Sequence, residues 1–191
     1  MEVQELRIAL ERVDHSKRKR MEMATTLINH PTNMEALMEI AFQVNHPLSC
    51  KASWVMEYVA KQRLDLLLPY MDRFINNCPA VYHESALRPI AKICEYLTES
   101  YFIAKDPDTR KALTEAHLSQ ITTNCFDWLI AEHKVATKAY AMSCLLLLGQ
   151  KHPWIWPELR LVLEQNYAQG SAAYKARARK ILAKIPVADS Q

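Results

Sequence analysis

Glycine is nearly absent from this chain of 191 residues, which contains only Gly149 and Gly170. Average usage would make about 7% of the residues glycine. Phosphate-binding loops, dinucleotide-binding fingerprints and nucleophile elbows all need glycine, because their backbone turns tightly or approaches a ligand closely. The sequence therefore excludes these three motifs. The same scarcity, together with abundant Leu, Ala, Glu, Lys and Met, predicts a chain of helices joined by short connections.

The sequence also lacks paired metal ligands, long apolar runs and a strong net charge. Its five cysteines form no C-x-x-C pair, and no H-E-x-x-H motif is present, so we expect no metal site and no cofactor. The longest apolar stretch, residues 139–148, is about half as long as a membrane-spanning helix. The acidic start is not that of a secretory signal. With reduced cysteines and a formal charge of +3, these features predict a cytoplasmic protein that does not bind membranes.

Helical periodicity extends over almost the whole chain, which we expect to form one domain over residues 1–191 with a polar insertion near residues 104–110. No stretch alternates with the period of a strand for long. Two pieces of helix punctuation stand out: Thr32–Glu35 is typical of a capping box, and Gly170–Ser171 is expected to end one helix and cap the next. A representative periodic segment contains Leu37, Ile40, Ala41 and Val44.

One signature, Ala-x-x-φ-φ-x-x-φ with φ apolar, recurs along the chain. Its four full copies begin at Ala52, Ala86, Ala141 and Ala178, and a partial copy begins at Ala24. Each full copy follows another amphipathic helix, so the repeated unit is a helix pair. The small alanine lets a partner helix approach. Such units cannot bury their apolar face alone, so we expect them to stack into a curved solenoid.

This signature resembles HEAT-type repeats over about residues 20–186. Four segments are similar to a family of short bacterial helical-repeat proteins, whose members often carry the label adenylosuccinate lyase: residues 49–57, 88–99, 125–128 and 175–179. The resemblance implies an all-α fold, a right-handed α–α superhelix (HEAT/ARM-like solenoid) of about five helical hairpins. The residues do not support the lyase label, because the Ser-Ser-x-Met-Pro-x-Lys-x-Asn loop of that superfamily is missing.

A lateral stripe lies beside the repeated seam, at the positions one before, two after and six after each marked alanine. It contains no acidic residue. Its members are Lys51, Trp54, Tyr58, Ser85, Arg88, Lys92, Tyr140, Ser143, Leu147, Arg177, Lys180 and Lys184. Stacked helix pairs would bring these residues into rows and form a basic surface with interleaved aromatic rings, suited to an anionic partner. Alternatively, the aromatic residues pack between repeats and the lysines keep the surface soluble.

These features predict a non-enzymatic binding or scaffold module that recognises an acidic protein or peptide. The expected partner-binding residues are Lys51, Trp54, Tyr58, Arg88, Lys92, Tyr140, Arg177, Lys180 and Lys184. One alternative is a nucleic-acid binder, including a DNA-glycosylase-like enzyme that uses Asp127 beside Trp128. Another is an enzyme of unrecognised type. We interpret Trp128 and the cysteines as core residues, and the basic run of residues 17–20 as a solvated helix start.

Overall fold

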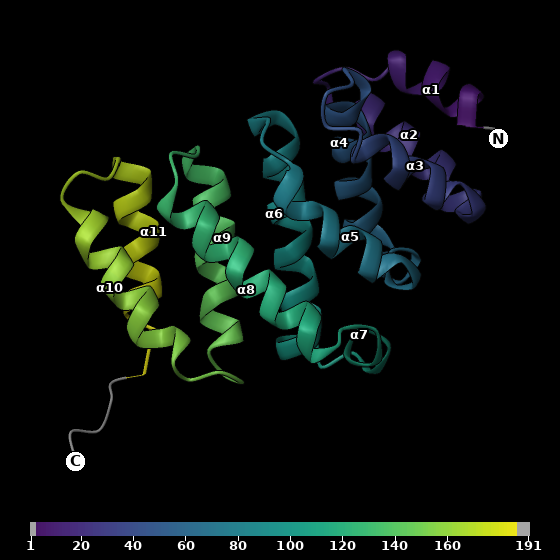
Figure 1. Cartoon of the computed structure of the whole chain (residues 1–191). Helices are drawn as coiled ribbons and strands as arrows, with labels where there is room; N and C mark the ends of the chain where they lie inside the picture. Colours follow the sequence, from purple (N-terminus) through teal and green to yellow (C-terminus); the bar gives the residue numbers. More distant parts are fainter. Residues whose placement is uncertain (1–2, 187–191) are drawn as a thin grey trace.

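The computed structural model of the chain describes residues 3–186, and every regular element within this range is helical (Figure 1). The predicted all-α class is confirmed. None of these helices is long and apolar enough to cross a membrane. The α-helices are α1 (Val3–Glu11), α2 (Lys17–Asn29), α3 (Met34–Ala41), α4 (Leu48–Gln62), α5 (Met71–Asn77), α6 (Glu84–Glu99), α7 (Pro107–Ala112), α8 (Glu115–Ile130), α9 (Val135–Leu148), α10 (Ile155–Tyr167) and α11 (Ala172–Leu182). Shorter helical turns are η1 (Pro31–Asn33), η2 (Leu64–Leu66), η3 (Leu68–Tyr70), η4 (Cys78–Ala80) and η5 (Ser100–Ala104).

One of the two helix caps predicted from the sequence is present in the structure. Ser171 caps α11, because its hydroxyl accepts a hydrogen bond from the backbone N–H of Tyr174 at 3.2 Å. The capping box predicted over residues 32–35 is wrong. Pro31 starts the 3-10 turn η1, which runs directly into α3, and Asn33 has the helical angles φ −86° and ψ −2°. Thr32, the N-cap of the predicted box, therefore lies inside η1 instead of before α3, and Asn33, which precedes α3, makes no side-chain cap hydrogen bond.

Five helices lie side by side in one row. Helices α2, α4, α6, α9 and α11 contact one another in chain order, and Figure 1 shows α4 to α11 running across the molecule from blue to yellow. Each of the five carries one copy of the alanine signature. The five marked alanines are all buried: Ala24, Ala52, Ala86, Ala141 and Ala178. The repeated seam of the sequence therefore corresponds to one line of helix contacts.

A second layer covers one side of this row. Helix α3 packs on α4, α8 packs on α9, and α10 contacts both α9 and α11, while α5 contacts α8 (Figure 1). The polar insertion forms the end of η5 and the start of α7, where Lys105 adopts a left-handed φ of 56° and Asp106 caps α7. One apolar cluster between the layers runs from Leu6 to Ile185.

Four of the five cysteines belong to this core, and Cys50 is partly exposed beside it. All five are free thiols, and the predicted burial of Cys94, Cys125 and Cys144 is confirmed. The pKa of Cys94 lies well above its usual value, because its thiol hydrogen bonds with Cys78 and is buried. Burial and the neighbouring Cys144 thiol also raise the pKa of Cys125 well above its usual value. These thiols are therefore neutral and contribute packing.

Candidate functional site

Stripe residues from α4, α6, α9 and α11 meet on one face of the row, which we call the stripe face. The Lys92 ammonium lies 4.6 Å from the ring centroid of Tyr96 and 4.9 Å from that of Tyr140, so it joins α6 to α9. The Arg177 guanidinium of α11 reaches Glu95 of α6 at 3.5 Å. Helices that are distant in sequence thus share one cluster of rings and charges.

Trp54 joins α4 to α6 through a hydrogen bond that a proline makes necessary. Pro89 lies inside α6 and has no backbone N–H, so the Ser85 carbonyl four residues earlier lacks its helical donor. The Trp54 indole N–H donates to that carbonyl at 2.7 Å. Trp54 is only 8% exposed. The alternative interpretation of the aromatic residues, packing between repeats, is therefore correct for Trp54.

Replacing Trp54 with phenylalanine tests this link. We expect the substitution to lower the free energy of unfolding by about 1 kcal/mol, because the Ser85 carbonyl loses its donor while most of the apolar contact remains. Urea unfolding followed by circular dichroism measures the change. The matched control is Trp154→Phe, at a tryptophan that is 56% exposed, which we expect to have little effect. Equal stabilities of the two variants would contradict the proposed role of the indole N–H.

Two acidic residues lie against the stripe and neutralise part of it. Glu57 pairs with Arg88 in a two-pronged contact, with N···O distances of 2.5 and 3.2 Å. Glu95 pairs with Lys92 at 2.5 Å as well as with Arg177, and its side chain is only 4% exposed. The stripe face is therefore a mixed-charge surface rather than a uniformly basic one.

The ion pairs keep the stripe cations charged despite their burial. Burial by itself lowers the pKa of Arg88, but hydrogen bonding to Glu57 and the Glu57 charge more than compensate and raise it above its usual value. The pKa of Lys92 is raised in the same way: burial opposes the shift, and Glu95 overrides it. Both side chains therefore present fixed positive charge at the surface over the physiological pH range.

The remaining predicted site residues take different positions. Tyr58 lies beneath the guanidinium of Arg20, which is 5.4 Å from the ring centroid, and so joins the cluster. Lys51 donates a hydrogen bond to the Glu11 carbonyl at 2.7 Å. Lys180 and Lys184 are exposed and make no hydrogen bond or ion pair within residues 3–186. The structure thus brings together six predicted residues: Trp54, Tyr58, Arg88, Lys92, Tyr140 and Arg177.

A cavity of about 220 Å³ opens where α4, α6 and α9 begin. We call it the Arg88 cavity; its lining includes His15, Arg20, Trp54, Ser85, Arg88 and Lys134. The His15 ring lies 4.7 Å from that of Trp54, and the Arg20 guanidinium is 5.8 Å from the same tryptophan ring. Arg20 comes from the basic run that was expected to be solvated, but its guanidinium lies over Trp54 and Tyr58 instead.

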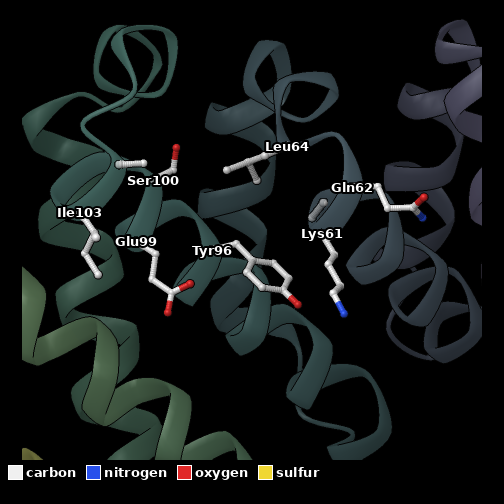
Figure 2. Close-up of a pocket in the computed structure, with 9 residues that line it drawn as sticks. Lys61, Gln62, Leu64, Tyr96, Glu99, Ser100 and Ile103 are labelled. Carbon is white, nitrogen blue, oxygen red and sulfur yellow. The ribbon is translucent and has the colours of Figure 1, made fainter.

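A second cavity, of about 440 Å³, lies where α4 and α6 end (Figure 2). We call it the Glu99 cavity; its lining includes Lys61, Gln62, Leu64, Tyr96, Glu99 and Ile103. Figure 2 shows the Tyr96 ring between Glu99 and Lys61. Burial, and next the charge of Glu95, raise the pKa of Glu99 above its usual value. Helical spacing places both cavities on the stripe face, at opposite ends of α4 and α6.

Asp127 lies apart from the stripe face. It is exposed on α8 and lines a different cavity of about 410 Å³ together with Phe126, His152 and Trp154. Trp128 is 5% exposed and belongs to the core, as expected from its spacing. None of the nine predicted partner-binding residues lines this cavity.

Several residues of the site were missed at the sequence level. The pairing of Glu95 with Lys92 could have been predicted, because the two residues are three apart on one helix and such pairs face each other. Glu57 and Lys134 had no such signal, because their partners or neighbours lie on other helices, and Arg20 was found only as part of a basic run that was interpreted as solvated.

Residues 3–186 contain no group of three or more His, Cys, Asp or Glu side chains arranged to hold a metal ion. No protein-family model matches the chain, and no curated protein or solved structure matches it.

Proposed function

We propose that this chain is a HEAT-like solenoid of five helical hairpins that binds a segment of a partner protein on its stripe face, as a non-enzymatic module of the cytoplasm. The observation that carries the proposal is the convergence of rings and cations from four helices. Flat rings offer contact area, and guanidinium groups bind carboxylates with two hydrogen bonds. The contacts of α2, α4, α6, α9 and α11 in chain order support the solenoid.

The charge pattern favours a protein segment over a nucleic acid. Glu57, Glu95 and Glu99 lie among the stripe cations. A continuous phosphate backbone would meet these carboxylates and be repelled. A protein segment carries isolated charges of both signs and can match an alternating surface. We therefore expect acidic side chains of the partner to lie near the Arg88 cavity and uncharged or basic ones near the Glu99 cavity.

The length of α6 sets the length of the segment. Its 16 residues span about 24 Å, and a cavity lies near each end. An extended chain advances about 3.4 Å per residue, so about seven residues would reach from one cavity to the other. This is short enough for a linear motif within a larger partner.

A double substitution tests the proposal. In Arg88→Gln with Arg177→Gln, the side chains stay polar but two stripe charges are removed. We expect proteins captured from cells by the tagged wild-type chain to be lost, with helicity by circular dichroism unchanged. The matched control, Lys111→Gln with Arg179→Gln, removes two exposed cations elsewhere and should retain the captured proteins.

Two outcomes would contradict the proposal. Identical capture by both double variants would show that the stripe charges do not bind the partner. Retention of the wild-type chain on DNA or RNA at low salt, falling steeply as salt rises, would instead favour the nucleic-acid alternative.

A further inference from the structure

We propose that the Arg88 cavity binds a phosphoryl group. The inference deepens the proposed function and rests on it in one respect, because a partner segment on the stripe face would carry this group. Three cationic side chains from different parts of the chain line the cavity: Arg20 from α2, Arg88 from α6 and Lys134 just before α9. Such convergence of cations around one small space is the arrangement that a doubly charged oxyanion requires.

The hydrogen-bonding capacity of these cations is only partly used. The Lys134 ammonium makes no hydrogen bond or ion pair with any residue of the described range. Arg20 donates from Nε to the Ser16 carbonyl and from Nη2 to the His15 carbonyl, which leaves Nη1 available. Stacking over Trp54 and Tyr58 orients its guanidinium. Arg88 donates from both terminal nitrogens to Glu57 and also interacts with Tyr140, so it contributes mainly its charge and the remaining N–H groups of its guanidinium.

The acidic residue in the lining does not occupy the cavity's donors. Glu84 lies among the lining residues, but one carboxylate oxygen contacts His133 Nδ1 at 2.6 Å. The other accepts the Lys134 backbone N–H at 3.3 Å. Glu84 thus fixes the segment that carries Lys134, while the side-chain ammonium of Lys134 stays free for a ligand.

The start of α9 adds to the positive potential. Ala136, in the first turn of α9, lines the cavity. The N-cap residue of α9 is Lys134, whose side chain makes no cap hydrogen bond, and the first turn has no acidic residue, although Glu84 of α6 accepts the Lys134 backbone N–H. A cation at this end of a helix is unfavourable, because the free N–H groups already carry partial positive charge. A bound anion would add to the negative charge that Glu84 supplies there.

The size of the cavity limits the ligand to a single group. Drug-sized ligands and nucleotides occupy pockets of about 300–1,000 Å³. The Arg88 cavity, at about 220 Å³, is smaller, which favours a single small group such as a phosphate monoester. Two negative charges on such a group match the free cations better than the single charge of a carboxylate.

Calorimetric titration of the full chain tests the assignment with three probes: inorganic phosphate, blocked phosphoserine and blocked glutamate. We expect both phosphorylated probes to bind, and glutamate to bind more weakly. Lys134→Ala should weaken phosphate binding about tenfold, because it removes one charge-assisted hydrogen bond. The matched control, Lys111→Ala, removes an exposed cation on α7 and should leave the affinity unchanged. Tighter binding of phosphoserine than of phosphate would identify a phosphorylated side chain as the source, and equal binding would identify the free anion.

Several results would overturn the inference. They are the absence of binding at millimolar phosphate, equal affinities of Lys134→Ala and Lys111→Ala, or glutamate binding as tightly as phosphoserine. These results can be distinguished from a failure of the proposed function, because that function is tested separately by partner capture without added phosphate. If the Arg88 and Arg177 double variant loses capture but phosphate does not bind the wild-type chain, the stripe face is still supported as the partner-binding surface. Only the assignment of the Arg88 cavity to a phosphoryl group is then wrong.

Discussion

Replacing Gly149 with alanine is expected to lower the free energy of unfolding by about 3 kcal/mol, because the new methyl group has no room. Its Cβ would lie 2.0 Å from Nε1 and 2.3 Å from Cδ1 of Trp156. The indole cannot easily withdraw, since its N–H donates to the Leu146 carbonyl at 3.0 Å. Gly149 has an ordinary φ of −58°, so the close approach of the ring, and not backbone strain, requires glycine here.

Urea unfolding of a double-mutant cycle isolates this effect. Trp156→Ala removes the ring, and in that background Gly149→Ala should change stability by less than about 0.5 kcal/mol. A Gly149→Ala variant as stable as the wild type would show that the contact of Gly149 with Trp156 is not as close as described.

Two carboxylates one helical turn apart on α6 are expected to act in opposite directions. Glu95→Gln removes a charge that pairs with Lys92 and Arg177, and should lower the free energy of unfolding by about 2 kcal/mol. This figure lies below the range for fully buried pairs because both cations reach solvent. Glu99→Gln removes a carboxyl that makes no hydrogen bond or ion pair within residues 3–186, and should stabilise the protein at neutral pH.

The raised pKa of Glu99 determines how its contribution to the free energy of unfolding changes with pH. Burial raises the pKa of its carboxyl above the ordinary value of 4.5, so the folded state binds this proton more tightly than the unfolded state does. The contribution of Glu99 to stability therefore falls as pH rises from 4.5 through the raised pKa, and stays low above it. Unfolding experiments on both proteins from about pH 4 to pH 8 should show that the stability of the wild type relative to Glu99→Gln falls as pH rises. Parallel profiles would contradict the assignment.

Local features of the fold could be predicted from the residues. Helical periodicity and the scarcity of glycine predicted an all-α chain, and the alanine signature marked the five helices that form the row. Ser171 was found as a cap because the capping group and its N–H lie three residues apart. The failed capping box near Thr32 shows the limit of this reasoning. Pro31 admits a 3-10 turn as well, and the spacing of residues 32–35 alone does not distinguish the two.

The candidate site depends on more than periodicity. Six of the predicted stripe residues lie together, but Glu57 and Glu95 change the surface from basic to mixed. From the sequence, Pro89 indicates that a carbonyl of α6 lacks its helical donor. Predicting that Trp54 donates to this Ser85 carbonyl also requires knowing that α4 and α6 are neighbours.

By itself, the sequence determined which residues form helices, which face of each is apolar, and which alanines mark the seam. Only the tertiary structure decided which charges are neutralised and where Arg20, Arg88 and Lys134 surround a cavity. The physical reason is how far apart in the sequence the interacting residues lie. Hydrogen bonds within a helix and its apolar periodicity involve residues three or four apart, whereas pairs such as Glu57 with Arg88 depend on the rotation and rise of one helix against another, which side-chain packing sets.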